Sequence, residues 1–262
     1  MLYIIKNKIP TFVENLRKMK KIISYPLSIL AYLWFLFFIC LFQPIQWLSL
    51  NIFGYQAHKK SVDYLNFFLI QTLFLIFSCA EVENRALIPE GEPIIFVSNH
   101  QGLFDIIGFA WFMRKFHPKF VSKIELGKGI PSVSYNLNHG GSVLIDRKDP
   151  KQALPALKKM GQYIEKYHRS TVIFPEGTRS KDGQFKTFAA NGLKILCKYA
   201  PNAYVIPVTI TNSWKVFRYG NFPLGLGNTL KFTVHPPIKV NECDFNTLFE
   251  KTEKAIVTDI IS

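Results

Sequence analysis

Residues 94–105 decide the fold and read Ile-Ile-Phe-Val-Ser-Asn-His-Gln-Gly-Leu-Phe-Asp. The apolar run 94–97 is typical of a buried strand. Polar and small residues follow it, and a helical pattern then extends over 106–115. A strand, a turn and a helix in this order form the first unit of an α/β domain.

The same alternation continues along the rest of the chain. We expect strands over 119–122, 142–145, 171–174, 204–209 and 230–235, and helices over 152–167, 187–198 and 244–261. Asp244 is the candidate N-cap of the last helix, and Leu248, Ile256 and Ile260 are expected to point inward. Pro207 interrupts one apolar strand, which we interpret as core. The pattern predicts an α/β domain.

The turn after the first strand carries a histidine and a carboxylate that can work together. His100 and Asp105 are five residues apart, which on one helix would place their side chains about 140° apart. They can therefore meet only if His100 lies on the turn and Asp105 lies in the first turn of the next helix. There the carboxylate would fix the imidazole tautomer and leave the other nitrogen as a base. The alternative is a hydrogen-bonded histidine near a helix cap.

A second loop follows the strand expected over 171–174. It begins after Phe174 and reads Pro-Glu-Gly-Thr-Arg-Ser over 175–180. Gly177 permits an unusual backbone angle or the close approach of a ligand. Arg179 supplies a planar fork that suits phosphate. The alternative is an ordinary turn with a surface Arg–Glu pair.

Two further cations follow predicted strands. Lys123 comes just after the strand over 119–122, and Arg147 follows the strand over 142–145 together with Asp146. Both cations are candidates for binding a phosphate. A solvated lysine and a structural Asp–Arg pair are the alternatives.

The N-terminal third has the composition of a membrane segment. Six basic residues lie within the first 21, and no Asp, Glu, Lys or Arg then appears until Lys59. The densest apolar run, 25–42, has about the length that crosses the hydrocarbon core, and Pro44 is expected to end its helix. A second uncharged run covers 64–80. Two crossings or a hairpin in one leaflet both leave the basic N-terminus and the large domain in the cytoplasm, at the inner membrane in a bacterium.

Two other readings of this region are less consistent with its sequence. A cleaved signal peptide would have a shorter and earlier apolar run with a small-residue cleavage site. A pair of soluble core helices would have a polar face, which is nearly absent here.

Composition excludes several classes of protein. The 262 residues are 48% hydrophobic, include 24 Phe and carry a formal net charge of +14. The positive charge favours an anionic membrane surface, because the basic residues are dispersed and no nucleic-acid recognition motif is present. The four cysteines are scattered, which argues against a disulfide framework, and no Cys/His cluster predicts a metal site.

Four blocks in this order resemble the 1-acyl-sn-glycerol-3-phosphate (lysophosphatidic acid) acyltransferases of the glycerolipid acyltransferase superfamily. The His100–Asp105 stretch resembles the family's H-x-x-x-x-D block. The second block corresponds to residues 123–131 and 141–147, the third to 174–180 and the fourth to 205–208. The resemblance covers roughly residues 90–212, and Glu-Gly-Thr-Arg-Ser is its most specific part.

The resemblance implies a fold and an activity. The fold is a mixed-sheet α/β acyltransferase domain, 86–262, preceded by a membrane-associated two-helix hairpin, 1–85. The activity is acyl transfer from acyl-CoA or acyl carrier protein to the sn-2 hydroxyl of lysophosphatidate, without a metal or other cofactor. His100 and Asp105 are then the catalytic residues. The substrate-binding residues are Lys123, Arg147, Glu176, Gly177, Thr178 and Arg179.

Alternatives and departures stay open at this point. Glycerol-3-phosphate or another lysolipid could be the acceptor, and a non-catalytic membrane-binding protein is the alternative from another class. Gly102 stands where many members have serine. Residues 188–192 lack a lysine that members usually have before the glycine, and the sequence leaves open whether Lys186 replaces it.

Overall fold

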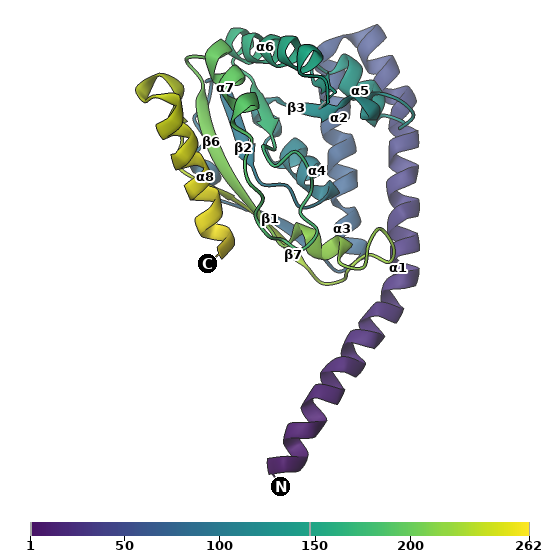
Figure 1. Ribbon diagram of the computed structural model, residues 1–262. Helices are drawn as coiled ribbons and strands as arrows, with labels where there is room; N and C mark the ends of the chain where they lie inside the picture. Colours follow the sequence, from purple (N-terminus) through teal and green to yellow (C-terminus); the bar gives the residue numbers. More distant parts are fainter. Residues whose placement is uncertain (1, 147, 262) are drawn as a thin grey trace.

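The computed structural model describes residues 2–146 and 148–261, and its centre is one eight-stranded mixed sheet (Figure 1). The strand order is β1-β7-β6-β2-β5-β3-β4, and β8 pairs with β6. Both antiparallel pairs among the described strands involve β6, which pairs with β7 and with β8. The predicted mixed α/β fold is therefore confirmed.

The strands and helices have the following bounds. The strands are β1 Cys79–Glu83, β2 Ile94–Ser98, β3 Pro118–Lys123, β4 Val143–Ile145, β5 Ser170–Ile173, β6 Tyr204–Thr211, β7 Thr229–Val234 and β8 Ile238–Lys239. The helices are α1 Leu2–Phe53, α2 Tyr55–Ile70, α3 Thr72–Leu75, α4 Leu103–Phe112, α5 Val133–His139, α6 Pro150–Tyr167, α7 Ala190–Tyr199 and α8 Phe245–Ile261. Short 3-10 turns connect several of them.

Helices cover both faces of the sheet, so each face has its own core. On β2, Ile94 and Phe96 point to the core shared with α1, α2, α3 and α4, because alternate residues of a strand face opposite sides. Ile95 and Val97 point to the core shared with α6, α7 and α8. Gly108 lets α4 approach the sheet, since a Cβ there would lie 2.2 Å from the Phe232 ring.

The last helix, α8, lies along β6 on the second face (Figure 1). Its predicted cap is confirmed, because Asp244 Oδ1 accepts hydrogen bonds from the backbone N–H groups of Asn246 and Thr247. Leu248 and Ile256 are buried, as expected, and Ile260 packs against the same core.

The first helix does not end at Pro44, so that prediction is wrong. α1 continues to Phe53, and α2 turns back along it after Gly54 (Figure 1). Proline removes one backbone donor from a helix, but tertiary packing outweighs that loss here. Phe42 and Gln46, on either side of the proline, are both buried.

The second uncharged run, 64–80, is not one helix. It is divided among the end of α2, α3 and the start of β1. β1 pairs with β7 from Cys79 onward, so the sheet begins within the residues assigned above to the N-terminal part. The N-terminal part therefore has one long apolar helix, α1, and a shorter helix, α2, which packs on α1 and on α4.

Pro207 sits in β6 without breaking the sheet. β8 pairs with β6 at Tyr204 and Val205, and β7 pairs with it from Val208. The proline thus lies between the two antiparallel partners, where the sheet needs no N–H from it.

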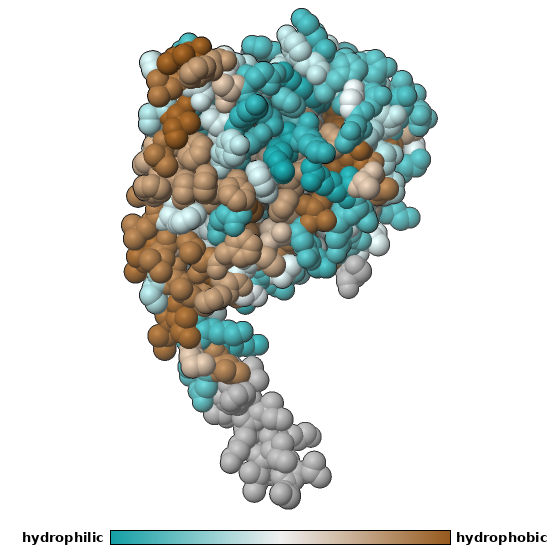
Figure 2. All heavy atoms as spheres, turned by 180° about the vertical axis from the view of Figure 1, so that it is seen from behind, coloured by the Kyte–Doolittle hydropathy of each residue, from teal (hydrophilic) through white to brown (hydrophobic). Residues whose placement is uncertain are grey.

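One face of α1 is covered by the protein and the other is bare and apolar. Residues 14–53 form a helix long and apolar enough to cross a membrane, and most of its apolar stretch is exposed. Figure 2 shows a continuous hydrophobic surface along this helix. The exposed large side chains include Ile29, Leu33, Leu36, Phe37 and Trp47.

Candidate active site

The turn between β2 and α4 brings His100 against Asp105. His100 Nδ1 lies 2.7 Å from Asp105 Oδ2. The same carboxylate oxygen accepts the backbone N–H groups of Gln101 at 2.6 Å and Gly102 at 2.8 Å. Asp105 is fully buried in the first turn of α4, where the helix N-terminus favours its negative charge. No described residue bonds His100 Nε2, so that nitrogen can act as a base.

Asn99, which the sequence analysis did not single out, anchors this turn to β6. Its side-chain amide donates to the Ile210 carbonyl at 2.8 Å and accepts the Ile210 N–H at 2.7 Å. Asparagine beside the histidine was visible in the sequence, but its partner lies 111 residues away. Only the parallel pairing of β2 with β6 brings them together.

The loop after β5 is joined to the same turn through the backbone of His100. The His100 N–H donates to Glu176 Oε2 at 3.1 Å, and the Ser180 N–H donates to the His100 carbonyl at 2.7 Å. The imidazole stacks on Phe174 with ring centroids 4.2 Å apart. Gly177 has φ +69°, a conformation that favours glycine. The two sequence blocks therefore form one site at the C-terminal ends of β2 and β5.

Glu176 is held inside this loop rather than on its surface. Its Oε1 accepts the Lys186 N–H at 3.3 Å. Burial raises the pKa of the Glu176 carboxyl to about 7, although the backbone N–H groups of His100 and Lys186 act in the opposite direction. Glu176 thus ties the loop to the turn that carries His100, and the exposed positions of the loop are Thr178 and Arg179.

Thr178 and Arg179 are exposed at the outer side of the loop, where Lys186 meets them. Lys186 Nζ donates to Thr178 Oγ1 at 3.1 Å and to the Arg179 carbonyl at 2.7 Å. An ammonium and a guanidinium therefore belong to one loop next to His100. Lys186 places a cation on the loop even though residues 188–192 contain no lysine.

Of the other two predicted cations, the structure describes Lys123. Lys123 lies at the end of β3, at the same edge of the sheet, and is paired with Glu125 at 3.1 Å. Both side chains are more than half exposed. Arg147 lies outside the described residues, so no position is assigned to it.

A side chain at position 102 would be crowded by the turn that follows β6. A Cβ at Gly102 would lie 2.8 Å from Ser213 Oγ and 3.3 Å from the Phe217 ring. The hydroxyl of Ser213 thus occupies the space beside the turn that a side chain at position 102 would fill.

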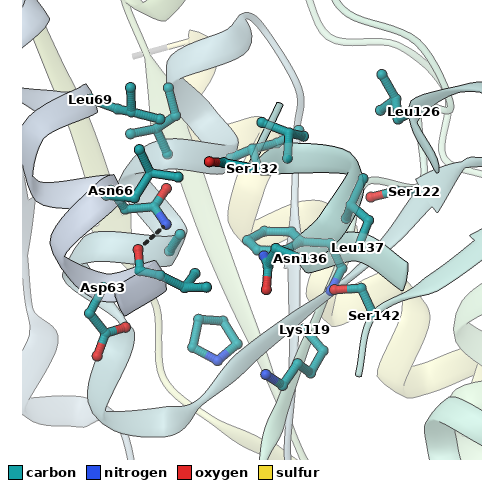
Figure 3. Close-up of a pocket in the computed structure, with 18 of the residues that line it drawn as sticks. Asp63, Asn66, Leu69, Lys119, Ser122, Leu126, Ser132, Asn136, Leu137 and Ser142 are labelled. Atoms are coloured by element: carbon teal, nitrogen blue, oxygen red, sulfur yellow. Dashed lines mark hydrogen bonds between the residues drawn. The ribbon is translucent and has the colours of Figure 1, made fainter. Parts of the chain in front are cut away.

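A cavity of about 270 Å³ runs from this site between α2, α4, β3 and α5 (Figure 3). Arg179 and Leu103 mark the end near His100. Much of the wall is apolar, and it includes Leu65, Leu69, Ile106, Ile107, Ala110, Phe120 and Leu137. The site therefore joins a base and a cationic loop to a space suited to a hydrocarbon chain.

Comparison with known proteins agrees with these features. Residues 79–211 match the family profile described as Acyltransferase. The chain is 29% identical over 164 residues to the chloroplastic 1-acyl-sn-glycerol-3-phosphate acyltransferase LPAT1 of Arabidopsis thaliana, covering 62% of this chain and 44% of that protein. It is 36% identical over 126 residues to the 1-acyl-sn-glycerol-3-phosphate acyltransferase of Helicobacter pylori, covering 47% and 50%. The chain spans about half the length of the curated relatives it matches.

A solved structure shares the whole fold. The 1-acyl-sn-glycerophosphate acyltransferase PlsC from Thermotoga maritima superposes with a TM-score of 0.71 and 22% sequence identity. The match covers 93% of this chain and 96% of that chain. It therefore includes the N-terminal helices as well as the sheet.

Proposed function

The chain belongs to the Acyltransferase family, and from that premise we propose that it acylates the sn-2 hydroxyl of lysophosphatidate. The acyl group comes from a thioester of coenzyme A or of acyl carrier protein, and the products are phosphatidate and the free thiol. The observation that carries the proposal is the buried His100–Asp105 hydrogen bond beside the cationic loop that carries Arg179 and Lys186. The names of the relatives support the choice of acceptor.

In the proposed mechanism His100 removes the proton from the acceptor hydroxyl. Asp105 keeps Nδ1 protonated, so Nε2 receives the proton, and the carboxylate stabilises the imidazolium that forms. The acceptor oxygen attacks the thioester carbonyl directly, without an acyl-enzyme. The tetrahedral intermediate then expels the thiolate, which takes the proton back from Nε2.

The oxyanion of that intermediate needs hydrogen-bond donors. The backbone N–H groups of His100, Gln101, Gly102 and Ser180 already donate to other groups of the protein. The donors for the oxyanion therefore come from other groups.

Arg179 and Lys186 are proposed to bind the acceptor phosphate. The guanidinium offers two parallel donors to phosphate oxygens, and Lys186 adds a second cation on the same loop. Thr178 and Gly177 belong to the same loop and are proposed to contact the substrate. Glu176 fixes this loop to the backbone of His100. Lys123, at the end of β3, and Arg147, which lies outside the described residues, remain proposed contributors to phosphate binding.

The acyl chain is proposed to enter the cavity beside α4. Leu103, Ile106 and Ile107 lead from the turn that carries His100 into the apolar wall. Burying a hydrocarbon chain there is favourable by about 25 cal/mol for each Å² of apolar surface removed from water.

The bare face of α1 is proposed to lie in the membrane, with the catalytic domain on the cytoplasmic side. Its large exposed apolar side chains suit lipid contact. Lys18, Lys20 and Lys21 are exposed near the start of the apolar stretch, where they suit an anionic lipid surface. This arrangement delivers a membrane-bound acceptor to the cavity.

Turnover of purified full-length protein in detergent tests the proposal. Wild type is expected to form phosphatidate from lysophosphatidate and an acyl thioester, whereas His100→Ala lowers kcat by about 10²- to 10⁴-fold because the base is gone. His139→Ala, a matched change at an exposed position on α5, should leave kcat unchanged. Assays with glycerol-3-phosphate and other lysolipids would redirect the proposal if one of them is preferred. No turnover with any acceptor would contradict it.

A further inference from the structure

The cavity beside the proposed active site has two chemically different ends. Arg179 marks the end next to the base. Lys119 lies four residues before Lys123, the last residue of β3. Along the strand it is therefore about 13 Å further than Lys123 from the edge of the sheet that carries the site. Figure 3 shows Lys119 and Asp63 together at one end of the cavity, with Leu69 and Leu126 at the other. We call the Lys119 side the inner end.

Positive charge is in excess at the inner end. Lys119 is only 7% exposed, and no acidic side chain of the described chain forms an ion pair with it. Asp63 is the only acid among the described residues that line the cavity, and its carboxylate is bonded to Lys59. Arg169 adds a further cation nearby, with its guanidinium bonded to Tyr163. A buried ammonium without a counter-charge is costly, so this end favours an anion.

Burial also affects the pKa of this lysine. It lowers the pKa of Lys119 to about 7, and the charges of Arg169 and Lys59 lower it further, against the opposing effect of Asp63. The aromatic ring of Tyr55 lies 5.2 Å from Lys119 Nζ. A bound anion would restore the charged form of the lysine.

Open hydrogen-bonding groups surround the same lysine. His58 is 1% exposed and its Nε2 has no partner among the described residues. His117 Nδ1 is likewise buried without a partner in the described chain, and both histidines line the cavity. Burial lowers the pKa of both imidazoles to about 4, so each is neutral and can present one N–H. Buried polar atoms are normally hydrogen-bonded, so their convergence on one space points to a ligand.

We propose that the inner end binds a carboxylate carried on an alkyl chain, with the chain lying along the apolar wall toward His100. Carboxylate oxygens accept from the Lys119 ammonium and from the imidazole N–H groups. A small inorganic anion would satisfy Lys119 but leave the apolar wall of Ile106 and Ile107 unfilled. The ligand is either a free fatty acid, which would exclude the acyl chain of a substrate, or a transferred acyl group that carries a second carboxylate at its far end.

Binding of dodecanoate labelled with ¹³C at its carboxyl group tests the site without turnover. With wild-type full-length protein in detergent, we expect a bound carboxyl resonance distinct from that of micellar dodecanoate. Lys119→Met should weaken binding by about tenfold or more, because a charge-assisted bond is lost. Lys115→Met, the same change at an exposed lysine near the start of β3, should bind like wild type.

A second variant acts in the opposite direction and covers the chance that Lys119→Met does not fold. Asp63→Asn removes the acid of the inner end, so dodecanoate should bind more tightly than to wild type. Equal affinity in wild type, Lys119→Met and Asp63→Asn would overturn the proposal. Absence of a distinct bound resonance, or displacement of dodecanoate by dodecanol as readily as by dodecanoate itself, would also overturn it.

A kinetic experiment distinguishes a free fatty acid from a transferred acyl group as the source of the carboxylate. Of the experiments on this site, only this one rests on the proposed function. If the site binds a transferred acyl group, Lys119→Met should lower kcat/KM for an ω-carboxydodecanoyl thioester about tenfold relative to dodecanoyl. If it binds a free fatty acid, dodecanoate should inhibit competitively against the dodecanoyl thioester, and Lys119→Met should relieve the inhibition. Failure of turnover would contradict the proposed function and leave the binding result standing.

Discussion

The two ends of the cavity stabilise a buried charge in opposite ways. The end marked by Arg179, which we call the outer end, adjoins the turn that carries His100. There the Asp105 carboxylate accepts three hydrogen bonds through one oxygen, and two of the donors are backbone N–H groups of the turn itself. At the inner end the Lys119 ammonium has no acidic partner in the described chain. The bonds that hold Asp105 Oδ2 are thus in place before any ligand arrives, and we call this the completed end. At the inner end His58 Nε2 and His117 Nδ1 have no hydrogen-bond partner within the described chain. Preorganisation is what a reacting centre needs, and open donors are what a binding site needs.

The largest expected effect comes from weakening the completed end. Asp105→Asn keeps a side-chain oxygen for the two backbone donors but removes the negative charge beside His100. The imidazolium then loses its stabilisation, and kcat should fall by about 10²-fold or more. The control is Asp244→Asn, a matched change at the exposed cap of α8, which should leave kcat unchanged. An Asp105→Asn enzyme within a few-fold of wild type would show that the carboxylate does not serve catalysis.

A smaller effect is expected on acceptor binding at the same end. Arg179→Met should raise KM for lysophosphatidate about tenfold while changing kcat much less, because a charge-assisted contact to phosphate is lost. Lys181→Met, an exposed lysine two residues further along, should leave KM unchanged. Initial-rate kinetics with varied lysophosphatidate separate the two parameters. A fall in kcat without a change in KM would mean that Arg179 acts in the chemical step and not in phosphate binding.

In the absence of a ligand, the inner end should affect the stability of the protein. The pKa of Lys119 is about 7 in the folded protein and near 10.5 when unfolded, so between these values the unfolded chain binds more protons. The free energy of unfolding should therefore rise as pH increases from about 7 to about 10. Lys119→Met removes this rise and should raise Tm at pH 7 by about 2–4 °C.

Thermal unfolding at several pH values, for wild type and Lys119→Met side by side, measures that contribution. Parallel curves for the two proteins would mean that the lysine is not desolvated, and the contrast between the two ends would then disappear.

The smallest effect tests how tightly the outer end is packed. Gly102→Ala places a methyl group 2.8 Å from Ser213 Oγ, so it should lower Tm by a few degrees. Ser213→Ala alone should be nearly neutral, because its hydroxyl has no partner in the described chain. The double variant should recover most of the loss, since the closest contact is removed. A loss in the double variant equal to that in Gly102→Ala would assign the strain to Phe217 instead.

The completed end could be predicted from the sequence because its geometry is local. The spacing of His100 and Asp105 required a histidine on the turn and a carboxylate in the first helical turn, and the structure has both there. The cap at Asp244 followed from the same kind of short-range reasoning. The catalytic roles of the two residues remain predictions.

The inner end could not be predicted, because its residues come from separate elements. His58 lies on α2 and Lys119 on β3, and neither belongs to a recognisable motif. For the same reason α1 continued through Pro44 when local rules predicted an end: packing against α2 decided the outcome. The pairing of Asn99 with Ile210 likewise depends on strand order, which the alternation of elements does not specify.

A single-turnover experiment tests the central claim most directly. Enzyme in excess over a labelled acyl thioester is mixed with lysophosphatidate, and thiol, phosphatidate and protein mass are followed together. We predict that thiol and phosphatidate appear at the same rate, only when lysophosphatidate is present, and that no acylated protein forms. A burst of thiol before phosphatidate, an acyl adduct on the protein, or thiol release without phosphatidate would contradict direct transfer to a hydroxyl activated by His100.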